Sequence, residues 1–373
     1  MKVFIVFGAR PEAIEMAPVV QALKVTMEAD TRVCVTAQHR AMLDQVLSLF
    51  QISPDYDLNL ITSGQTLSEI SSRILVGVTG VLEQWTTDLI LVHGDATTTA
   101  MTSMACFYQR IPVGYVEAGL RTGNMWSPWP EEFNHRLAGL VTRLHFAPTE
   151  QVRTNLLAEK IPADWIEVTG NTVVSALLQV SDCIDHDLQA QFQQKLNFLD
   201  DRKRILFVTG HRRENFGDGM QSIRRGLLAL SKCDDLEIVY PVHRNPNVSG
   251  PVEERLAGQP GIHLLAPQDY LSFAYLMKRC SVLLTDRGGI QEEAPALDKP
   301  VLVMQDATER PEAVAAGTVR LVDTDAANIE REVATLLDDW QTYLLISISM
   351  NPYGDGTAAQ QICSSVERYL ASA

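Results

Sequence analysis

Residues 281–304 read SVLLTDRGGIQEEAPALDKPVLVM, and this stretch decides the fold. A short apolar run is followed by two glycines, Gly288 and Gly289, then by a stretch of helical character and a second apolar run. The order strand, glycine turn, helix, strand predicts a βαβ unit whose helix N-terminus presents N–H groups to a phosphate. Arg287 is unexpected, because a small residue before the glycines would let a ligand approach the backbone.

The same pattern recurs along the chain. We expect strands over 3–7, 32–36, 89–92, 112–116, 144–147, 166–168, 205–209, 237–242, 262–265, 281–285 and 300–304. Apolar runs that alternate with helical patterns indicate parallel sheets covered on both faces. A chain of 373 residues is long for one core, and the polar stretch 170–203 lies between the two groups of strands. The sequence therefore predicts an α/β protein with two Rossmann-like, doubly wound domains.

Composition excludes several classes of protein. Hydrophobic residues make up 46% and charged residues 21% of the chain, as in soluble globular proteins. The formal charge of −15 argues against nucleic acid or an anionic membrane as a partner. The opening MKVFIVFGARPE is typical of a first strand and not of a signal peptide. The six cysteines are scattered and show no metal-ligand spacing, so we expect no metal site and a cytoplasmic protein.

Polar residues follow the expected strands of the first half, and ligands of open α/β sheets bind at the carboxyl ends of strands. Arg10 follows the first strand in GARPEAIEMAP, Asp95 lies in HGDATTT, Glu117 in EAGLRTG, and Glu131 follows SPWP. Each acid could simply cap a helix or interact with its dipole. Three carboxylates at comparable positions favour a shared site instead, because proton transfer needs positioned acids and bases.

The loops of the second half are richer in cations and aromatic residues. The residues singled out there are His211, Arg212, His243, Gln268, Phe273, Glu293 and Arg310. His211 and Arg212 follow a strand in TGHRREN and suit a diphosphate. Gln268 and Phe273 could contact a base edge and a base face, although Phe273 could equally belong to the core.

Ten motifs, in order from residue 2 to beyond residue 356, resemble the bacterial non-hydrolysing UDP-N-acetylglucosamine 2-epimerases. The motifs are FGARPEAIEMAP, TAQHRAMLDQVL, HGDATTT, EAGLRTG, SPWPEE, TGHRREN, VYPVHRNPNV, DRGGIQEEAP, ERPEAVAAGT and NPYGDG. The resemblance implies a GT-B-like pair of domains with the nucleotide in an interdomain cleft, no cofactor, and a homodimer. It places the domains at 1–170 and 171–355, with a helix over 356–373 that returns to the first domain.

The resemblance also implies a reaction, the interconversion of UDP-GlcNAc and UDP-ManNAc. UDP is eliminated to give 2-acetamidoglucal and is then added again. The product would supply the synthesis of a surface polysaccharide. The implied catalytic group is Asp95, Glu117, Glu131 and His211. The implied nucleotide contacts are Arg10, Gln268, Phe273, Gly288, Gly289, Glu293 and Arg310. The implied site for a second, activating UDP-GlcNAc is Gln38, His39, Arg212 and His243.

Several positions depart from the family pattern. Glu15 stands where relatives carry Lys, and Arg287 stands where they carry Ser. Ala9 and Ala96 each replace Thr, Tyr115 replaces His, and His135 replaces Arg. We expect Arg287 to supply the cation that Glu15 removes from the diphosphate, and the two residues to pair when no nucleotide is bound. Two alternatives remain open: a UDP-sugar-binding paralogue with reduced or lost turnover, and a hydrolysing relative.

Overall fold

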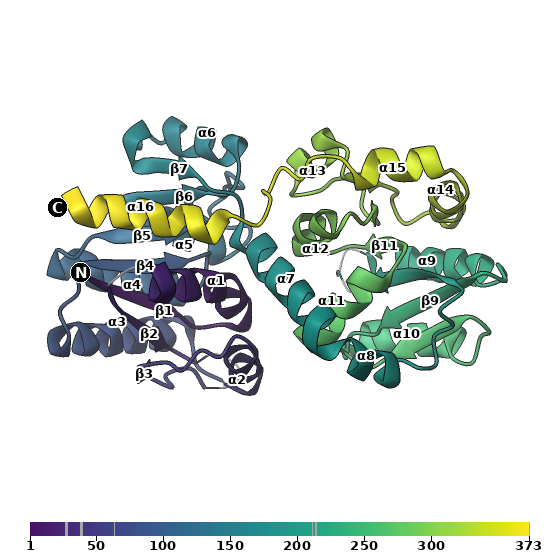
Figure 1. The fold of residues 1–373 in the computed structure, drawn as a ribbon, viewed down its shortest axis with the longest axis horizontal. Coiled ribbons are helices and arrows are strands. Elements are labelled where there is room, and N and C mark those ends of the chain that lie inside the picture. Colours follow the sequence, from purple (N-terminus) through teal and green to yellow (C-terminus); the bar gives the residue numbers. More distant parts are fainter. Residues whose placement is uncertain (27–28, 38–39, 63, 211, 213–214, 373) are drawn as a thin grey trace. The chain divides into compact units, whose positions relative to one another are not determined.

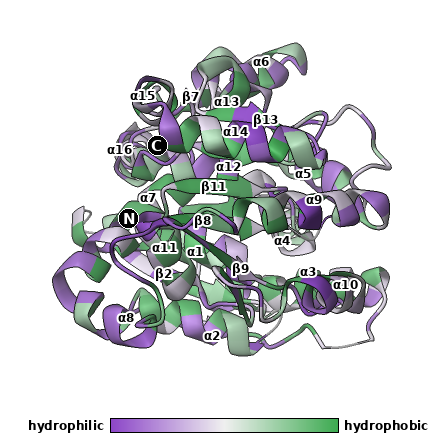
Figure 2. Cartoon of the chain, turned by 90° about the vertical axis from the view of Figure 1, so that its right-hand side faces the viewer, coloured by the Kyte–Doolittle hydropathy of each residue, from purple (hydrophilic) through white to green (hydrophobic). Residues whose placement is uncertain are grey.

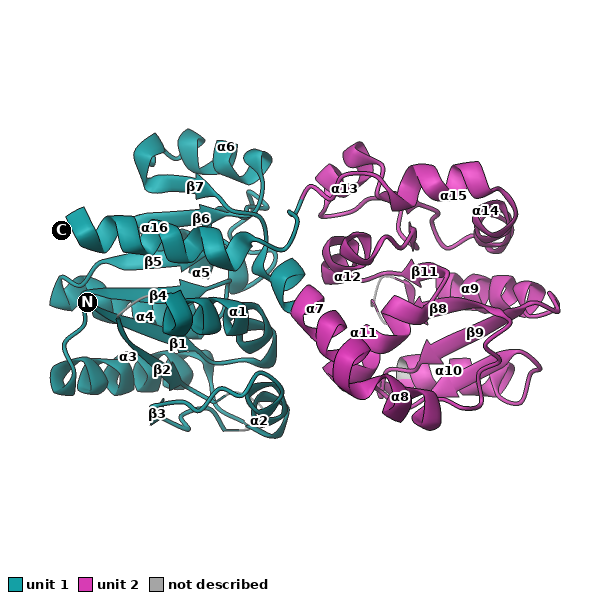
Figure 3. Cartoon of the chain, in the orientation of Figure 1, with its two compact units in different colours: residues 1–176, 353–373 teal, residues 177–352 magenta. Residues whose placement is uncertain are grey.

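The computed structural model describes the whole chain except residues 27–28, 38–39, 63, 211, 213–214 and 373. The chain forms two compact units (Figure 3). Unit 1 comprises Met1–Ala176 and Tyr353–Ala373, and unit 2 comprises Leu177–Pro352. The boundary falls inside helix α7 (Thr172–Cys183). The sequence prediction placed these boundaries at 170 and 355.

Unit 1 contains a parallel sheet covered by helices (Figure 1). Its strands are β1 (Lys2–Phe7), β2 (Asp30–Val35), β3 (Tyr56–Asp57), β4 (Leu89–His93), β5 (Val113–Val116), β6 (Leu144–Ala147) and β7 (Ile166–Val168). Among the described residues they pair in the order β3-β2-β1-β4-β5-β6-β7. Strands β4 and β5 are buried over their whole length, because helices cover both faces of a parallel sheet.

The helical elements of unit 1 connect these strands. They are α1 (Arg10–Thr26), α2 (Arg40–Leu49), α3 (Leu67–Gln84), α4 (Thr97–Gln109), α5 (Glu131–Val141), α6 (Glu150–Ala158), η1 (Ala163–Trp165), the first part of α7, and α16 (Ala358–Ser372). The last helix, α16, packs on α1, and Thr26 Oγ1 lies 3.0 Å from Cys363 Sγ. The C-terminal segment therefore belongs to unit 1.

Unit 2 repeats the strand order. Its strands are β8 (Arg204–Thr209), β9 (Leu236–Pro241), β10 (Ile262–Leu265), β11 (Val282–Thr285), β12 (Val301–Val303) and β13 (Val319–Leu321). In the part of the chain that is described, they pair in parallel as β10-β9-β8-β11-β12-β13. Figure 2 shows hydrophobic colouring on β8 and β11, whose side chains form the core with Leu227, Val252 and Ile329.

The helical elements of unit 2 lie between and beside these strands. They are η2 (Ile184–Leu188), α8 (Gln189–Lys195), α9 (Asp218–Leu230), α10 (Pro246–Leu256), α11 (Tyr270–Arg279), α12 (Gly288–Glu293), η4 (Ala294–Leu297), α13 (Pro311–Ala316), α14 (Ala326–Asp338) and α15 (Trp340–Ser347), together with the second part of α7. None of the described helices is both long enough and apolar enough to cross a bilayer.

The predicted fold class, α/β with two parallel sheets, is confirmed, and the strand prediction missed two edge strands. Strand β3 is only two residues long and β13 contains Arg320 in the sequence VRL, so neither forms an apolar run. Each sheet reverses its strand order beside its first strand, between β1 and β4 in unit 1 and between β8 and β11 in unit 2. Loops that leave such a switch point diverge and open a crevice for ligands.

Candidate functional site

The loop after β1 is held by a buried carboxylate. Glu12 Oε2 accepts hydrogen bonds from Gly8 N at 2.7 Å and Ala9 N at 3.4 Å, and so satisfies N–H groups at the start of α1. A Cβ on Gly8 would lie 2.4 Å from Thr36 Oγ1 and from Thr98 Oγ1, so only glycine fits. Burial raises the pKa of Glu12 to about 7, against the hydrogen bonds from the backbone.

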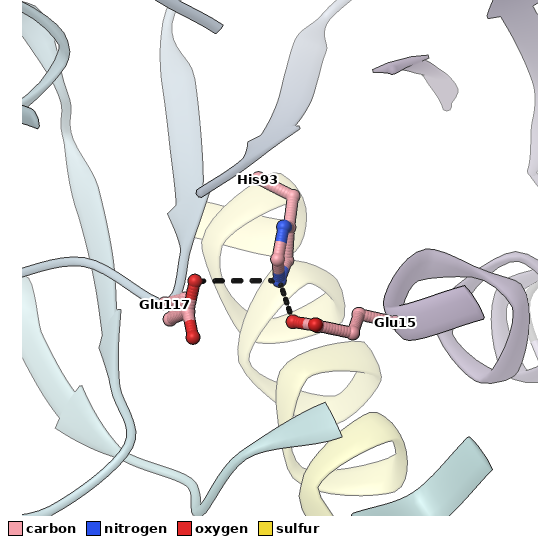
Figure 4. A group of neighbouring side chains, drawn as sticks. All are labelled: Glu15, His93 and Glu117. Carbon is pink, nitrogen blue, oxygen red and sulfur yellow. Dashed lines mark ion pairs between the residues drawn. The ribbon is translucent and has the colours of Figure 1, made fainter. Parts of the chain in front are cut away.

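One turn further along α1, Glu15 meets the end of β4. Glu15 Oε2 lies 2.6 Å from His93 Nε2, and Glu117 Oε2 lies 3.9 Å from the same nitrogen (Figure 4). His93 is 3% exposed. The short contact with Glu15 is an ion pair whose angles are not those of a hydrogen bond. Neither ring nitrogen of His93 has a hydrogen-bond partner among the described residues.

The charge of this cluster follows from its neighbours. Burial alone would lower the pKa of His93, but the carboxylate of Glu15, helped by Glu117 and Glu12, raises it to about 9. His93 is therefore an imidazolium at neutral pH, flanked by two carboxylates. The motif HGDATTT directed attention to Asp95, and the sequence analysis did not single out His93, whose partners come from α1 and from the loop after β5.

Asp95 is placed by a second network at the same edge. Its backbone carbonyl accepts a hydrogen bond from Asn134 Nδ2 at 2.8 Å, and its carboxylate lies 3.9 Å from His135 Nε2. The hydroxyl of Tyr115 donates a hydrogen bond to Gly94 O at 2.9 Å. In the close contact with His135, the Tyr115 oxygen is therefore the acceptor and the Nδ1–H of the histidine is the donor. Burial raises the pKa of Tyr115 well above its usual value, so the hydroxyl stays protonated.

The two other predicted acids lie at this edge as well. Glu117 follows β5 with a left-handed φ of +63°, and its Oε1 accepts a hydrogen bond from Asn171 Nδ2 at 3.2 Å. A non-glycine residue in this region is strained, which is common at functional sites. Glu131 is the first residue of α5. Partial burial and then the charge of Glu131 raise the pKa of Asp95, so these two carboxylates interact.

The switch point of unit 2 is organised by a buried aspartate. Asp286, 0% exposed, follows β11, and its Oδ2 accepts hydrogen bonds from Arg212 N at 2.9 Å and Asn215 Nδ2 at 3.3 Å. The hydroxyls of Thr209 and Thr285 lie 2.7 Å apart where β8 and β11 end. Asp286 therefore holds Arg212 and Asn215 after β8, a role that the sequence analysis did not assign to it.

Arg287 and Phe273 lie together in unit 2. The Arg287 guanidinium carbon is 5.8 Å from the centre of the Phe273 ring, and that ring is 5.0 Å from the ring of buried Phe207. Phe273 is thus half-buried, with one contact to the core and one to a cation. A Cβ on Gly289 would meet no atom of the described residues within 4 Å, including those of Arg287.

Other predicted nucleotide contacts have partners within unit 2. Arg310 Nε pairs with the carboxylate of buried Glu292. Tyr270 donates to Glu293 Oε1 at 3.5 Å, and Gln268 Nε2 donates to Ala266 O at 2.6 Å. Gly288 begins α12, close to Arg310. Arg10 begins α1 in unit 1.

The predicted activator site is described only in part. Gln38 and His39 lie outside the described residues, as does the predicted catalytic residue His211. Arg212 Nη1 lies 3.4 Å from Glu309 Oε1, and exposed His243 accepts a hydrogen bond on Nδ1 from Asn245 N at 3.1 Å. Glu15 and Arg287 each have a partner within their own unit, so the Glu15–Arg287 pair stays a prediction.

The chain thus has two doubly wound α/β units with polar loops at the carboxyl ends of their strands. This arrangement defines a class: α/β proteins that bind their ligands at strand ends.

Comparison with known proteins narrows the class to a family. The family profile described as UDP-N-acetylglucosamine 2-epimerase matches residues 21–367. The chain is 54% identical to the UDP-N-acetylglucosamine 2-epimerase of Salmonella typhimurium over 375 residues, covering 100% of both. It is 53% identical to that of Escherichia coli (strain K12), covering 98% of each. The crystal structure of the Neisseria meningitidis enzyme bound to UDP-GlcNAc superposes with a TM-score of 0.89 at 48% identity, covering 99% of this chain and 100% of that one. The chain belongs to the UDP-N-acetylglucosamine 2-epimerase family.

Proposed function

We propose that this chain interconverts UDP-N-acetylglucosamine and UDP-N-acetylmannosamine. The observation that carries the proposal is the gathering of Asp95, Glu117 and Glu131 at one sheet edge in a member of this family. Inversion at C2 of the sugar requires a proton to leave one face and another to arrive on the opposite face. At least two groups that exchange protons are needed, and this edge supplies three carboxylates.

The reaction proceeds by elimination and re-addition. A carboxylate of unit 1 removes the C2 proton, the electron pair forms the C1=C2 bond, and the C1–O bond breaks with UDP as leaving group. The resulting 2-acetamidoglucal accepts a proton on the other face of C2, and a UDP oxygen bonds again to C1. Burial and the charge of Glu131 raise the pKa of Asp95, which suits Asp95 to act as a proton donor.

Unit 2 holds the UDP in this proposal. Phe273, beside Arg287, offers a half-buried ring for the base, and Gly288 and Gly289, near Arg310, receive the diphosphate. Glu293, held by Tyr270, accepts hydrogen bonds from the ribose. Gln268 contacts the base edge and Arg10 of unit 1 the diphosphate. His211 completes the catalytic group.

Gln38, His39, Arg212 and His243 form the site of a second, activating UDP-GlcNAc in this proposal. The protein works in the cytoplasm, where nucleotide sugars are made, and its product supplies a surface polysaccharide. It acts as a homodimer: the neighbouring helices α3, α4 and α5 expose large apolar side chains, namely Val76 (71%), Phe107 (62%), Tyr108 (62%) and Leu140 (80%). Phe107→Asp should convert a dimer to a monomer in analytical ultracentrifugation.

A binding protein with little turnover is the second candidate, because Glu15 adds a negative charge beside His93 at the acidic edge. Incubation with UDP-GlcNAc in D2O separates the candidates. Epimerisation yields UDP-ManNAc with deuterium at C2, hydrolysis yields free sugar and UDP, and a binding protein yields neither. NMR at C2 distinguishes these three outcomes. The absence of UDP-ManNAc would overturn the proposal.

A further inference from the structure

The cluster Glu15–His93–Glu117 goes beyond the proposed reaction. One carboxylate oxygen of Glu15, the Nε2 of His93 and one carboxylate oxygen of Glu117 all lie within 4.8 Å of one another. They come from α1, β4 and the loop after β5, and Figure 4 shows both carboxylates directed at the same ring nitrogen. We propose that these three side chains form a binding site for a divalent transition-metal cation of the zinc type.

The distances fit such a cation after small side-chain movements. Zinc bonds to imidazole nitrogen and carboxylate oxygen are about 2.0–2.2 Å, so two donors of a tetrahedral site lie roughly 3.3 Å apart. The two observed contacts to His93 Nε2, 2.6 Å and 3.9 Å, lie on either side of that separation. One carboxylate has to move away from the nitrogen and the other toward it, each by less than about 1 Å.

The donor atoms are those of an incomplete site. His93 is 3% exposed, and its Nε2 and Glu15 Oε2 make no hydrogen bond among the described residues. A single proton on Nε2 can form a hydrogen bond with only one carboxylate at a time, whereas a cation can bind all three donors together. The donors also stand on rigid elements: His93 ends a central strand, and Glu15 lies inside a helix.

The donor set selects the class of metal. Imidazole nitrogen suits zinc, copper, iron and nickel, while magnesium and calcium prefer oxygen alone and more ligands. Three protein donors leave a fourth position open, as in catalytic zinc sites. A cation here would occupy the Glu117 carboxylate that the proposed reaction needs, so metal binding should inhibit turnover, and a chelator should reverse the inhibition.

The test measures binding without any nucleotide sugar, so its outcome is independent of the proposed reaction. Full-length protein is stripped with a chelator, dialysed and titrated with Co²⁺, whose visible absorption reports ligation, and Zn²⁺ is then added as competitor. We expect one Co²⁺ per chain, displaced by Zn²⁺. Glu15→Gln and Glu117→Gln should each weaken binding roughly tenfold or more, because each removes one ligand.

The matched control is the Glu237–His263 pair of unit 2. Glu237 Oε1 lies 3.5 Å from His263 Nε2, and the described residues bring no third donor to it. Glu237→Gln should therefore leave metal affinity unchanged. Circular dichroism melting of every variant shows that it is folded, and Zn²⁺ should raise the melting temperature of the parent but not of Glu15→Gln. An absence of stoichiometric binding, or binding that survives Glu15→Gln, would mean that Glu15 and His93 form only an ion pair.

Discussion

The two units use one strand order to build two chemically different edges. At the switch point of unit 1, a buried imidazolium, His93, lies among the carboxylates of Glu15 and Glu117. At the switch point of unit 2, a buried aspartate, Asp286, holds the loop that carries Arg212. Both arise where adjacent parallel strands send their loops in opposite directions.

The comparison shows that strand order determines where a site lies, whereas the side chains of the loops determine its chemistry. Burial and the charge of Glu131 raise the pKa of Asp95, and a carboxyl group with a raised pKa suits proton transfer. Guanidinium groups remain charged and suit a diphosphate. We therefore expect substitutions at the edge of unit 1 to affect turnover and substitutions at the edge of unit 2 to affect nucleotide affinity.

The largest effect is expected for Asp95→Asn. The amide cannot exchange a proton at the sugar, so turnover should fall about 100-fold or more, as for other general acids and bases. UDP affinity, measured by calorimetry, should stay unchanged because the nucleotide contacts that we propose lie mainly in unit 2. Full turnover in this variant would remove Asp95 from the catalytic group.

Glu12 should make the stability of unit 1 depend on pH. Its pKa rises from 4.5 in the unfolded chain to about 7 in the folded one, so the folded chain keeps the proton to higher pH. The contribution of Glu12 to stability is therefore greatest below pH 4.5 and is lost as the pH rises from 4.5 to about 7. The shift corresponds to roughly 3 kcal/mol.

Urea unfolding of the parent and of Glu12→Gln at several pH values tests this. The amide still accepts hydrogen bonds from Gly8 and Ala9 but does not titrate, so the difference in unfolding free energy between the two proteins should change across this window. A difference that is constant with pH would show that Glu12 ionises normally in the folded protein.

A smaller effect is expected for Phe273→Ala in unit 2. Loss of a stacking platform should weaken UDP binding by about 1–2 kcal/mol, as for bases stacked on aromatic rings. Turnover at saturating substrate should change little, which separates this variant from Asp95→Asn. If melting shows lost stability while UDP affinity is kept, the contact with Phe207 is the main role of the ring.

The smallest effect concerns the coupling between Glu15 and Arg287. If Arg287 compensates for Glu15, Arg287→Ser should weaken UDP binding and the addition of Glu15→Lys should recover it, with a coupling above about 0.5 kcal/mol. A double-mutant cycle by calorimetry measures this coupling. Additive effects would mean that the two residues never meet, consistent with the separate contacts of Glu15 with His93 and of Arg287 with Phe273.

Sequence patterns predicted most of the fold because buried parallel strands are continuous apolar runs. The run 205–209 and the observed β8, Arg204–Thr209, differ by one residue at the start. The edge strands β3 and β13 were missed, because their short or polar sequences gain strand geometry only by pairing with β2 and β12. Asp95, Glu117 and Arg212 could be singled out from the chain because each lies within three residues of the end of a strand.

By itself, the sequence determined the class of the sheets, the order of the motifs and the set of loops at the strand ends, since these depend on neighbouring residues. Only the tertiary structure decided which side chains meet: Glu15 with His93, Tyr115 with His135, and Asp286 with the loop after β8. Partners so far apart in the chain are brought together by strand order. Their pKa values follow from burial and distance, which the linear sequence does not contain.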